Sequence, residues 1–273
     1  VVHAVCNNGY YKSVDGGVTW VQKIVGNIES LDVAPLAPNI IWITKRNDGV
    51  YKSTNWGDNF VRQNNYPLTG SNFKTASISV AYSSITTVYV SASGDDGMTK
   101  GQHRSTDGGA TWQDRTWRAS GNVVQIHGAN GQGSRNNCIG VSPTNPNLVI
   151  VGGVDGIRTT DGGATWAYIP LDIGTVHDDF CVIKWLSNGS TVYIGTDGGI
   201  SHSTNGGAVF NTTTSIFPAM QFYGIDAAAN SSGFVITGGT QDNSIVNTSN
   251  DGTTWFTYSI ADASHTTIDK NNP

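Results

Sequence analysis

Three neighbouring polar residues, His177, Asp178 and Asp179 in the stretch VHDDF, carry the side chains best suited to chemistry in this sequence. A histidine beside two carboxylates could transfer a proton near neutral pH or hold a divalent cation such as calcium. The alternative is that these side chains only hydrogen-bond to the backbone of their loop. Asp178 and Asp179 are the candidate metal ligands, and beyond such a cation the sequence indicates no cofactor.

Two more carboxylates, Asp155 and Asp197, belong to DG pairs between apolar runs. A DG pair is typical of a two-residue hairpin turn, and Asp48 and Asp96 repeat it, so turn chemistry explains most of these residues. As an alternative, Asp155 and Asp197 are the candidate catalytic residues of a glycoside hydrolase, which uses a pair of carboxylates.

The stretch GGTQDNS departs from the DG pattern and places three polar side chains where the other turns have two. Long segments between the apolar runs supply the other candidates, because loops on a rigid scaffold often carry function. The candidate ligand-binding residues are Trp117, Arg118, His127, Arg135, His177, Asp178, Asp179, Gln241, Asp242 and Asn243. Trp117, Tyr66 and Phe73 are the aromatic residues expected to stack on sugars or anchor a partner.

The elements that would position these residues follow from an internal repeat. Six segments share the order Ser/Thr, any residue, Asp/Asn, any residue, Gly, two residues and an aromatic: SVDGGVTW, STNWGDNF, STDGGATW, TTDGGATW, STNGGAVF and TSNDGTTW. The terminal aromatics are 40, 52, 54, 44 and 45 residues apart. This period is that of a four-stranded propeller blade.

Each repeated position has a physical reason. The Asp or Asn accepts backbone hydrogen bonds in an Asx-type turn, the glycine permits positive φ, and the aromatic packs against a neighbouring sheet. These residues are therefore predicted to be structural. The third positions are Asp15, Asn55, Asp107, Asp161, Asn205 and Asn250, and the aromatics are Trp20, Phe60, Trp112, Trp166, Phe210 and Trp255.

The sequence therefore predicts an all-β propeller of four-stranded antiparallel blades, six of them visible in one domain. The expected boundaries are 1–25 for a partial first blade, then 26–65, 74–118, 136–170, 179–212 and 220–260. Residues 264–273 read as an innermost strand, either of the first blade or of a further blade. The ring is then closed with six blades or belongs to a propeller of seven or more.

The repeated segments resemble the Asp-box, or bacterial neuraminidase repeat, over nearly the whole chain. The stretches VHDDF, YIGTDGGISHSTNGG, QFYGIDAAAN and GGTQDNS resemble a secreted bacterial subgroup described as sortilin-like or glycosyl-hydrolase-like. This resemblance implies an extracellular or cell-surface location and further domains in the same polypeptide. It includes sialidases and family 74 xyloglucanases, but the chain has no RIP signature and a single glutamate, Glu29, which disfavours a sialidase.

Composition narrows the partners. The formal net charge is −5, and no block of Lys or Arg offers a surface for nucleic acid. No apolar run of about 18 residues is present, so membrane insertion is not expected. Three cysteines fit no zinc pattern; they are read as small buried side chains, with a Cys138–Cys181 disulfide as the alternative.

Because successive strands reverse direction, the repeated turns should lie on one face of the propeller, and the DG turns and blade-to-blade loops on the other. The function predicted is non-catalytic recognition of a glycan or a surface protein through the face opposite the repeated turns. The alternative is a xyloglucanase-like endo-glucanase, which would need a second propeller to complete its cleft.

Overall fold

The computed structural model describes an all-β chain. The described residues are 1–34, 36–171, 176–212, 222–230, 233–241, 244–249, 254–257, 262–264 and 266–268. Within them, strands form six antiparallel sheets and one small hairpin, and the one helical element is a 3-10 turn, η1 (Gly70–Asn72). None of the described helices is long and apolar enough to cross a membrane.

Four sheets contain four consecutive strands each and form blades 2 to 5. Blade 2 consists of β4 (Ile28–Val33), β5 (Ile41–Lys45), β6 (Gly49–Ser53) and β7 (Val61–Arg62). Blade 3 consists of β8 (Thr75–Ala81), β9 (Ser84–Ser93), β10 (Thr99–Ser105) and β11 (Gln113–Asp114). Blade 4 consists of β14 (Cys138–Val141), β15 (Val149–Gly152), β16 (Gly156–Thr159) and β17 (Ala167–Tyr168). Blade 5 consists of β18 (Phe180–Trp185), β19 (Val192–Thr196), β20 (Gly199–Ser203) and β21 (Asn211–Thr212).

The remaining strands form three further sheets. Blade 1 has three strands, β1 (Val2–Cys6), β2 (Gly9–Ser13) and β3 (Val21–Val25). Blade 6 consists of β22 (Phe222–Asn230), β23 (Gly233–Thr240), β24 (Ile245–Thr248) and β25 (Phe256–Thr257). The loop between blades 3 and 4 folds into a hairpin that the sequence did not predict, with strands β12 (Arg118–Ala119) and β13 (Asn122–Val123).

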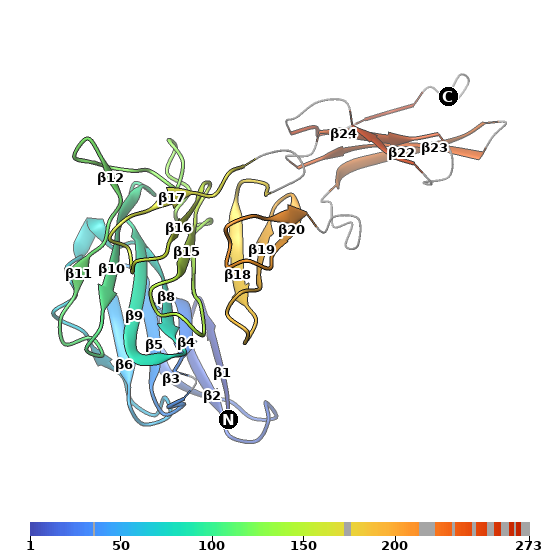
Figure 1. The fold of residues 1–273 in the computed structure, drawn as a ribbon. Helices are drawn as coiled ribbons and strands as arrows, with labels where there is room; N and C mark the ends of the chain where they lie inside the picture. Colours follow the sequence, from blue (N-terminus) through green and yellow to red (C-terminus); the bar gives the residue numbers. More distant parts are fainter. Residues whose placement is uncertain are drawn as a thin grey trace.

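The first strands of blades 2 to 5 lie side by side around a common channel, in the order β4, β8, β14, β18. Figure 1 shows this arc, with blade 1 next to β4 and with β22 to β24 lying apart from the other blades. The predicted architecture of multiple four-stranded blades is therefore confirmed.

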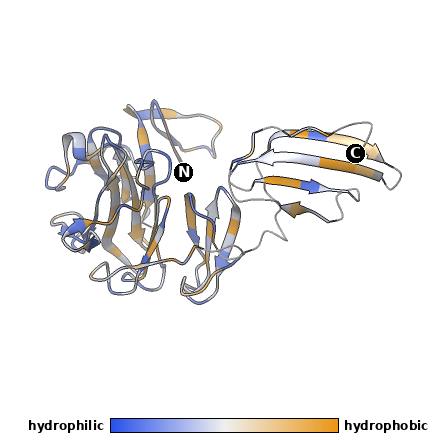
Figure 2. Cartoon of the chain, turned by 90° about the horizontal axis from the view of Figure 1, so that it is seen from above, coloured by the Kyte–Doolittle hydropathy of each residue, from blue (hydrophilic) through white to orange (hydrophobic). Residues whose placement is uncertain are grey.

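Apolar side chains fill the joints between neighbouring blades, and Figure 2 shows these hydrophobic positions along the strands. One cluster joins blade 2 to blade 3 and includes Trp42, Val88 and Val90. Comparable clusters join blades 1 and 2, 3 and 4, and 4 and 5. Each fully buried Ile or Val stabilises the fold by about 1.5–3 kcal/mol, so these joints hold the arc together.

The repeated turns share one hydrogen-bond network. In the first turn, the Ser13 hydroxyl donates to Asp15 Oδ1 at 2.7 Å and accepts from the Gly17 N–H at 2.8 Å. Asp15 also accepts from the Thr19 N–H at 2.9 Å. The same pattern recurs around Asn55, Asp107, Asp161 and Asn205. The polar side chains thus satisfy backbone donors that the turn would otherwise leave unpaired.

The second glycine of these turns is needed for both conformation and space. Gly109 has φ 93°, in the left-handed region that favours glycine. A Cβ atom there would lie 2.6 Å from Cη2 of Trp42, in the preceding blade. Trp112 then packs edge-on against Trp42 with ring centroids 6.2 Å apart. The turn therefore also belongs to the joint between blades 2 and 3.

The two ends of the blades are distinct. The backbone N–H groups of Gly162 and Gly206 bond to carbonyls in the turn between the first two strands of their own blade, and that of Gly108 bonds to the Thr86 carbonyl near the start of β9. At the opposite end, the Asn47 N–H bonds to the Lys74 carbonyl, which links a turn of the DG type to the entry of the next blade. The repeated turns therefore lie at one end, and the DG turns and blade-to-blade loops at the other.

A cation on the third strand of each of blades 2 to 4, and on β2 of blade 1, reaches the following blade. Lys52 Nζ donates to the Gly108 carbonyl at 2.8 Å, and Arg158 Nε donates to the Gly206 carbonyl at 2.6 Å. Lys12 pairs with Asp58 at 2.9 Å, and Arg104 donates to Asn147 at 2.7 Å. Hydrogen bonds from charged donors are stronger than neutral ones. Each of these joints therefore has a bond from a charged side chain, which we call a latch, in addition to its apolar cluster.

Near the C-terminus, described residues contact blade 6. Asp226 Oδ2 on β22 accepts from the Ile268 N–H at 2.9 Å and from the Thr267 hydroxyl at 3.1 Å. The Ala263 N–H bonds to the Thr240 carbonyl on β23.

The cysteines and two aromatic residues differ from expectation. All three cysteines are free, so the Cys138–Cys181 disulfide is not formed, and only Cys138 is buried. Cys6, the last residue of β1, and Cys181, on β18, are exposed. The expectation that Tyr66 and Phe73 are exposed is wrong: both pack into the joint between blades 2 and 3.

Candidate functional site

Four DG-type turns meet the blade-to-blade loops at the end opposite the repeated turns, and their carboxylates have different surroundings. Asp48 bonds to Arg62 at 2.9 Å and to the Tyr51 hydroxyl at 2.8 Å, and Asp96 bonds to Lys100 at 2.6 Å. These partners belong to the same blade as the turn. Asp48 and Asp96 therefore stabilise their own blades, as the sequence indicated.

Asp197, in the turn between β19 and β20, instead links three parts of the chain. Its Oδ2 accepts from Arg135 at 3.2 Å and from Gln241 Nε2 at 2.8 Å. Arg135 precedes blade 4, and Gln241 follows β23 in blade 6. The carboxylate has 15% side-chain exposure, whereas Arg135 has 60%. The structure thus brings three sequence-predicted residues together, with the guanidinium facing solvent.

The VHDDF segment lies between Asp155 and Asp197. His177 pairs with Asp178 at 2.7 Å, and Asp179 accepts a hydrogen bond from Asn136. Asp179 has φ 60°, and its N–H bonds to the Val154 carbonyl at 3.0 Å in the turn of blade 4. An Asp tolerates this left-handed conformation better than most residues, so Asp179 shapes the loop as it enters blade 5.

Asp155 is the carboxylate without a bound partner. Its side chain makes no hydrogen bond or ion pair with any described residue, and it is half-buried in the turn between β15 and β16. Burial raises the pKa of Asp155, and the nearby Asp178 carboxylate raises it further. Asp155 therefore combines a raised proton affinity with free acceptor oxygens.

An aromatic pair lies close to Asp155. Trp117 and Tyr168 meet edge-on with ring centroids 4.6 Å apart, and Tyr168 is 51% exposed. Burial raises the pKa of the Tyr168 hydroxyl, with a further contribution from the charge of Asp155. Arg118, on β12, is bound to Asp114, on β11, at 3.2 Å. Trp117 and Tyr168 thus present an amphipathic aromatic surface beside an unpartnered carboxylate.

The other predicted residues lie elsewhere. His127 is completely buried, 3.2 Å from the Thr99 hydroxyl, and burial lowers its pKa to about 4. Asp242 and Asn243 lie outside the described residues, as does Asn250 of the last repeated turn. Among the residues that the structure describes, no group of three or more His, Cys, Asp and Glu side chains is arranged to hold a metal ion.

The repeated turns lie at the far end of the blades. Hydrogen bonds from neighbouring threonines and serines lower the pKa of Asp107 and Asp161 to about 2 and also lower that of Asp15. Trp166 and Phe210 are buried, Phe60 and Trp112 are partly buried in joints, and Trp20 and Trp255 are 41% and 44% exposed. These aspartates are held ionised by local bonds that leave little capacity for a ligand.

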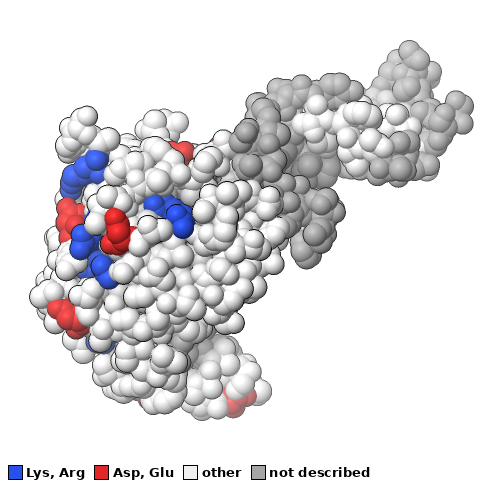
Figure 3. Space-filling view, viewed as in Figure 1, with Lys and Arg blue, Asp and Glu red and all other residues white. Residues whose placement is uncertain are grey.

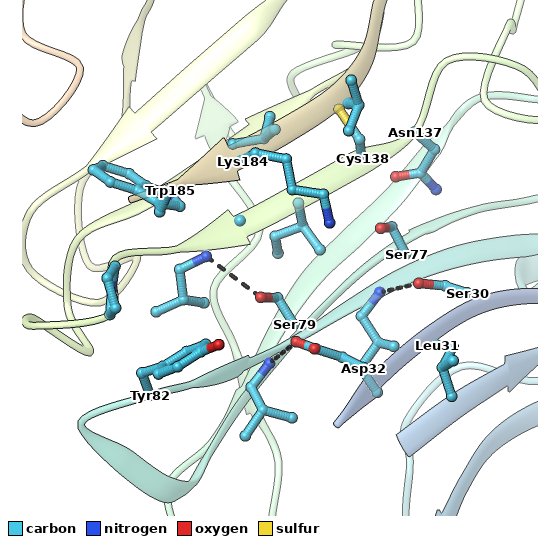
Figure 4. Close-up of a pocket in the computed structure, with 18 of the residues that line it drawn as sticks. Ser30, Leu31, Asp32, Ser77, Ser79, Tyr82, Asn137, Cys138, Lys184 and Trp185 are labelled. Carbon is cyan, nitrogen blue, oxygen red and sulfur yellow. Dashed lines mark hydrogen bonds between the residues drawn. The ribbon is translucent and has the colours of Figure 1, made fainter. Parts of the chain in front are cut away.

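A hollow also lies along the axis of the arc formed by blades 2 to 5 (Figure 4). Its volume is about 460 Å³, and residues of β4, β8, β14 and β18 line it. Ser30, Asp32, Ser77, Ser79 and Lys184 give it a polar wall. Sequence reasoning did not single out these residues, because the alternation within one strand does not reveal which positions of neighbouring blades face each other. Tyr168 was missed for the same reason.

Charged side chains are sparse on the molecular face shown in Figure 3, where basic and acidic groups are intermixed. The site is therefore defined by individual polar and aromatic side chains rather than by a charged field.

The fold and its neighbours define a class of protein. No family model and no curated protein sequence matches the chain. Solved structures do match. The GH74 xyloglucanase from Xanthomonas campestris is 14% identical with a TM-score of 0.52, and the match covers 93% of this chain and 38% of the enzyme. An ancestral GH74 enzyme is 17% identical with a TM-score of 0.50, covering 96% of this chain and 35% of the enzyme.

Two similar structures are not described as enzymes. The extracellular domain of the one-component system BT4673 from B. thetaiotaomicron is 14% identical with a TM-score of 0.55, covering 93% of this chain and 31% of that one. YCF48 bound to D1 peptide is 15% identical with a TM-score of 0.50, covering 93% of this chain and 78% of YCF48. The chain spans about a third of the length of the GH74 enzymes. At these identities the likeness establishes the fold, and the chain is a multi-bladed β-propeller.

Proposed function

We propose that this chain is a recognition propeller that binds a glycan without cleaving it, through the surface formed by Trp117, Tyr168 and Asp155. The observation that carries the proposal is an unpartnered carboxylate beside an aromatic pair, in which Tyr168 is half-exposed and Trp117 is partly buried. An aromatic ring provides a large rigid surface at low conformational entropy cost. The oxygens of Asp155 can accept hydrogen bonds from sugar hydroxyls.

Asp197 supports binding rather than catalysis. Arg135 and Gln241 both donate to its Oδ2, so charge-assisted and neutral hydrogen bonds already occupy this oxygen and fix the position of the carboxylate. A glycosidase requires two carboxyl groups that act as acid, base or nucleophile. The surroundings of Asp155 and Asp197 therefore favour recognition over catalysis. A surface protein is the other class of partner that the blade-to-blade loops could bind.

A glycoside hydrolase is the second candidate, and one observation favours it. The raised pKa of Asp155 is a property of general acids in glycosidases. Under this alternative a second propeller, as in a xyloglucanase-like endo-glucanase, would complete the cleft.

The repeated turns and the neighbours support two finer proposals. The shared network around Asp15, Asp107 and Asp161 supports membership of the Asp-box superfamily, in the secreted sortilin-like or glycosyl-hydrolase-like subgroup. The printed descriptions of an extracellular domain and a xyloglucanase among the neighbours support an extracellular or cell-surface location. Further domains of the same polypeptide are expected under this proposal.

The test uses a panel of β-glucans and other neutral oligosaccharides with Asp155→Asn and Tyr168→Ala as variants. We expect the wild type to bind at least one neutral glycan without releasing reducing ends, and each variant to bind it at least about tenfold more weakly. Lys23→Gln, on the outer strand β3, is the control. Release of reducing ends by the wild type that Asp155→Asn abolishes would establish the hydrolase instead.

A further inference from the structure

The inner strands carry an equivalent position whose side chain faces the next blade. Strand pairing identifies it: Asp32 lies opposite Trp42, Ser79 opposite Tyr89, Gly140 opposite Ile150 and Lys184 opposite Tyr193. Asp32 Oδ2 accepts from the Val80 N–H of the next blade at 2.7 Å. The four residues define a row around the channel.

Two side chains of this row, and the equivalent Asp226 of blade 6, act as hydrogen-bond acceptors. Ser79 Oγ accepts from the Val141 N–H of the next blade at 3.4 Å. Asp226, on the first strand of blade 6, accepts from the Ile268 N–H at 2.9 Å. Gly140 has no side chain, and Trp185 packs against it. Lys184 is the exception, because an ammonium group has three donors and no acceptor.

Lys184 therefore cannot form this bond between blades, and its side chain enters the central hollow instead. Figure 4 shows it extending from β18 into the space between the strands. Its charge acts on Asp32, which belongs to β4, two strands beyond its nearest neighbour in the arc. The Lys184 side chain makes no hydrogen bond or ion pair with any described residue, although its backbone pairs with Tyr193.

The other charges in the hollow are already compensated. Asp32 accepts from the N–H groups of Val33 and Val80, and burial raises its pKa, which favours its neutral form. Glu29 is bound to Arg46 at 2.8 Å. Lys184 is thus the uncompensated charge of this wall, and a positive charge in a partly enclosed polar hollow attracts an anion.

Hydroxyl donors and aromatic rings surround that charge. Ser30 Oγ accepts from the Ile78 N–H at 3.2 Å, which leaves its own proton free to donate, and the Ser77 hydroxyl makes no hydrogen bond with a described residue. Tyr82 and Trp185 lie on the wall of the same hollow. A volume of about 460 Å³ falls within the usual range of small-ligand pockets, ~300–1,000 Å³.

From this arrangement we propose that the central hollow is a subsite for an acidic sugar, with Lys184 binding the carboxylate of a uronic acid residue. One ammonium group matches the single charge of a carboxylate. Ser30 and Ser77 donate to the same carboxylate or to ring hydroxyls, and Tyr82 and Trp185 face the sugar ring. This proposal rests on the proposed glycan recognition and names a second, acidic ligand class for it.

The experiment is calorimetric titration at low salt with a trisaccharide of galacturonic acid, its methyl ester and a short peptide with a free C-terminal carboxylate. The variants are Lys184→Gln and Ser77→Ala, and Lys23→Gln removes one positive charge on an outer strand as the matched control. We expect the wild type and Lys23→Gln to bind the acidic trisaccharide. We expect the methyl ester, and the acidic sugar on Lys184→Gln, to bind at least about tenfold more weakly, and Ser77→Ala to bind about fivefold more weakly.

The outcomes separate this inference from the proposed function. Equal binding of the trisaccharide by wild type and Lys184→Gln, or of the acid and its methyl ester, would overturn the subsite. Tighter binding of the peptide than of the sugar would also overturn it. Neutral glycan binding that Asp155→Asn weakens and Lys184→Gln leaves unchanged would keep the proposed function while the acidic subsite fails on the acidic probe.

Discussion

The joints that connect blades 2 to 5 differ from the face of blade 5 that points away from blade 4. In blade 2, Asp32 and Lys52 hydrogen-bond to blade 3, and Trp42 packs against it. Trp42 is completely buried. In blade 5 the same row reads Lys184, Tyr193 and His202, and Tyr193 is 39% exposed.

Each substitution in that row removes one contribution to a joint. Lys184 cannot accept a backbone N–H, and His202 is stacked on Tyr193, with ring centroids 5.7 Å apart, where blades 1 to 4 carry Lys or Arg. No latch from His202 to another blade is present among the described residues. A joint between two blades thus depends on three aligned positions, one on each of the first three strands of a blade. All three positions differ in blade 5, next to the point where blade 6 departs from the arc (Figure 1).

The first prediction has the largest effect and compares Trp42 in blade 2 with Tyr193 in blade 5, the middle residues of the two rows. Trp42→Ala removes a buried ring from the joint of blades 2 and 3, and should lower the free energy of unfolding by about 3–5 kcal/mol. Tyr193→Ala, at the equivalent but exposed position, should cost less than about 1 kcal/mol. Urea unfolding followed by tryptophan fluorescence and circular dichroism measures both. Equal losses would mean that the face of blade 5 is as well covered as that of blade 2.

The next effect concerns acid sensitivity of a joint. His103 is buried next to the Tyr66 hydroxyl, 3.1 Å away, and burial lowers its pKa to about 4, with Asp114 and Arg118 as the charged neighbours. The unfolded chain binds this proton near pH 6.5 and the folded chain does not. Stability should therefore fall by about 1.4 kcal/mol per pH unit as pH drops from about 6.5 to 4.

His103→Gln keeps a side chain that can bond to Tyr66 and removes the titrating group. Its unfolding free energy, measured between pH 7 and 4, should lose that part of the slope. An unchanged slope would show that His103 binds its proton in the folded state as readily as in the unfolded state.

The smallest effect tests the latch. Arg158→Gln removes the 2.6 Å bond to the Gly206 carbonyl, and should cost about 1.5–3 kcal/mol. His202→Gln, the matched change in blade 5, should shift the unfolding free energy by less than about 0.5 kcal/mol. The melting temperatures of both variants measure this difference, and a comparable loss for His202→Gln would reveal a latch to blade 6.

The repeat predicted the fold well because its residues act locally. Ser105, Asp107 and Gly109 form their turn through bonds within a few residues, so their order alone specifies the conformation. The DG turns are equally local. The blade-to-blade loops are not: Tyr66 and Phe73 look like exposed loop aromatics in sequence, yet they fill the space beside Trp112.

The candidate site was predictable only in part. The VHDDF residues and Asp197 stood out by type, but their partners Asn136 and Gln241 come from other blades. The pairing of Trp117 with Tyr168 depends on a hairpin, β12–β13, that carries no strong strand pattern. The role of Lys184 becomes visible only when four strands are aligned by their pairing partners.

The latches from third strand to following turn all run in the same direction along the chain. Each of blades 2 to 4 therefore holds the donor for its successor and the receiving turn for its predecessor, so these blades are joined head to tail. Such an interface is heterologous, and the number of units it joins is set by geometry rather than by special end contacts. Tandem duplication of one blade-length gene segment would consequently add a unit with its contacts already encoded, which gives this architecture an easy evolutionary route to new blade numbers.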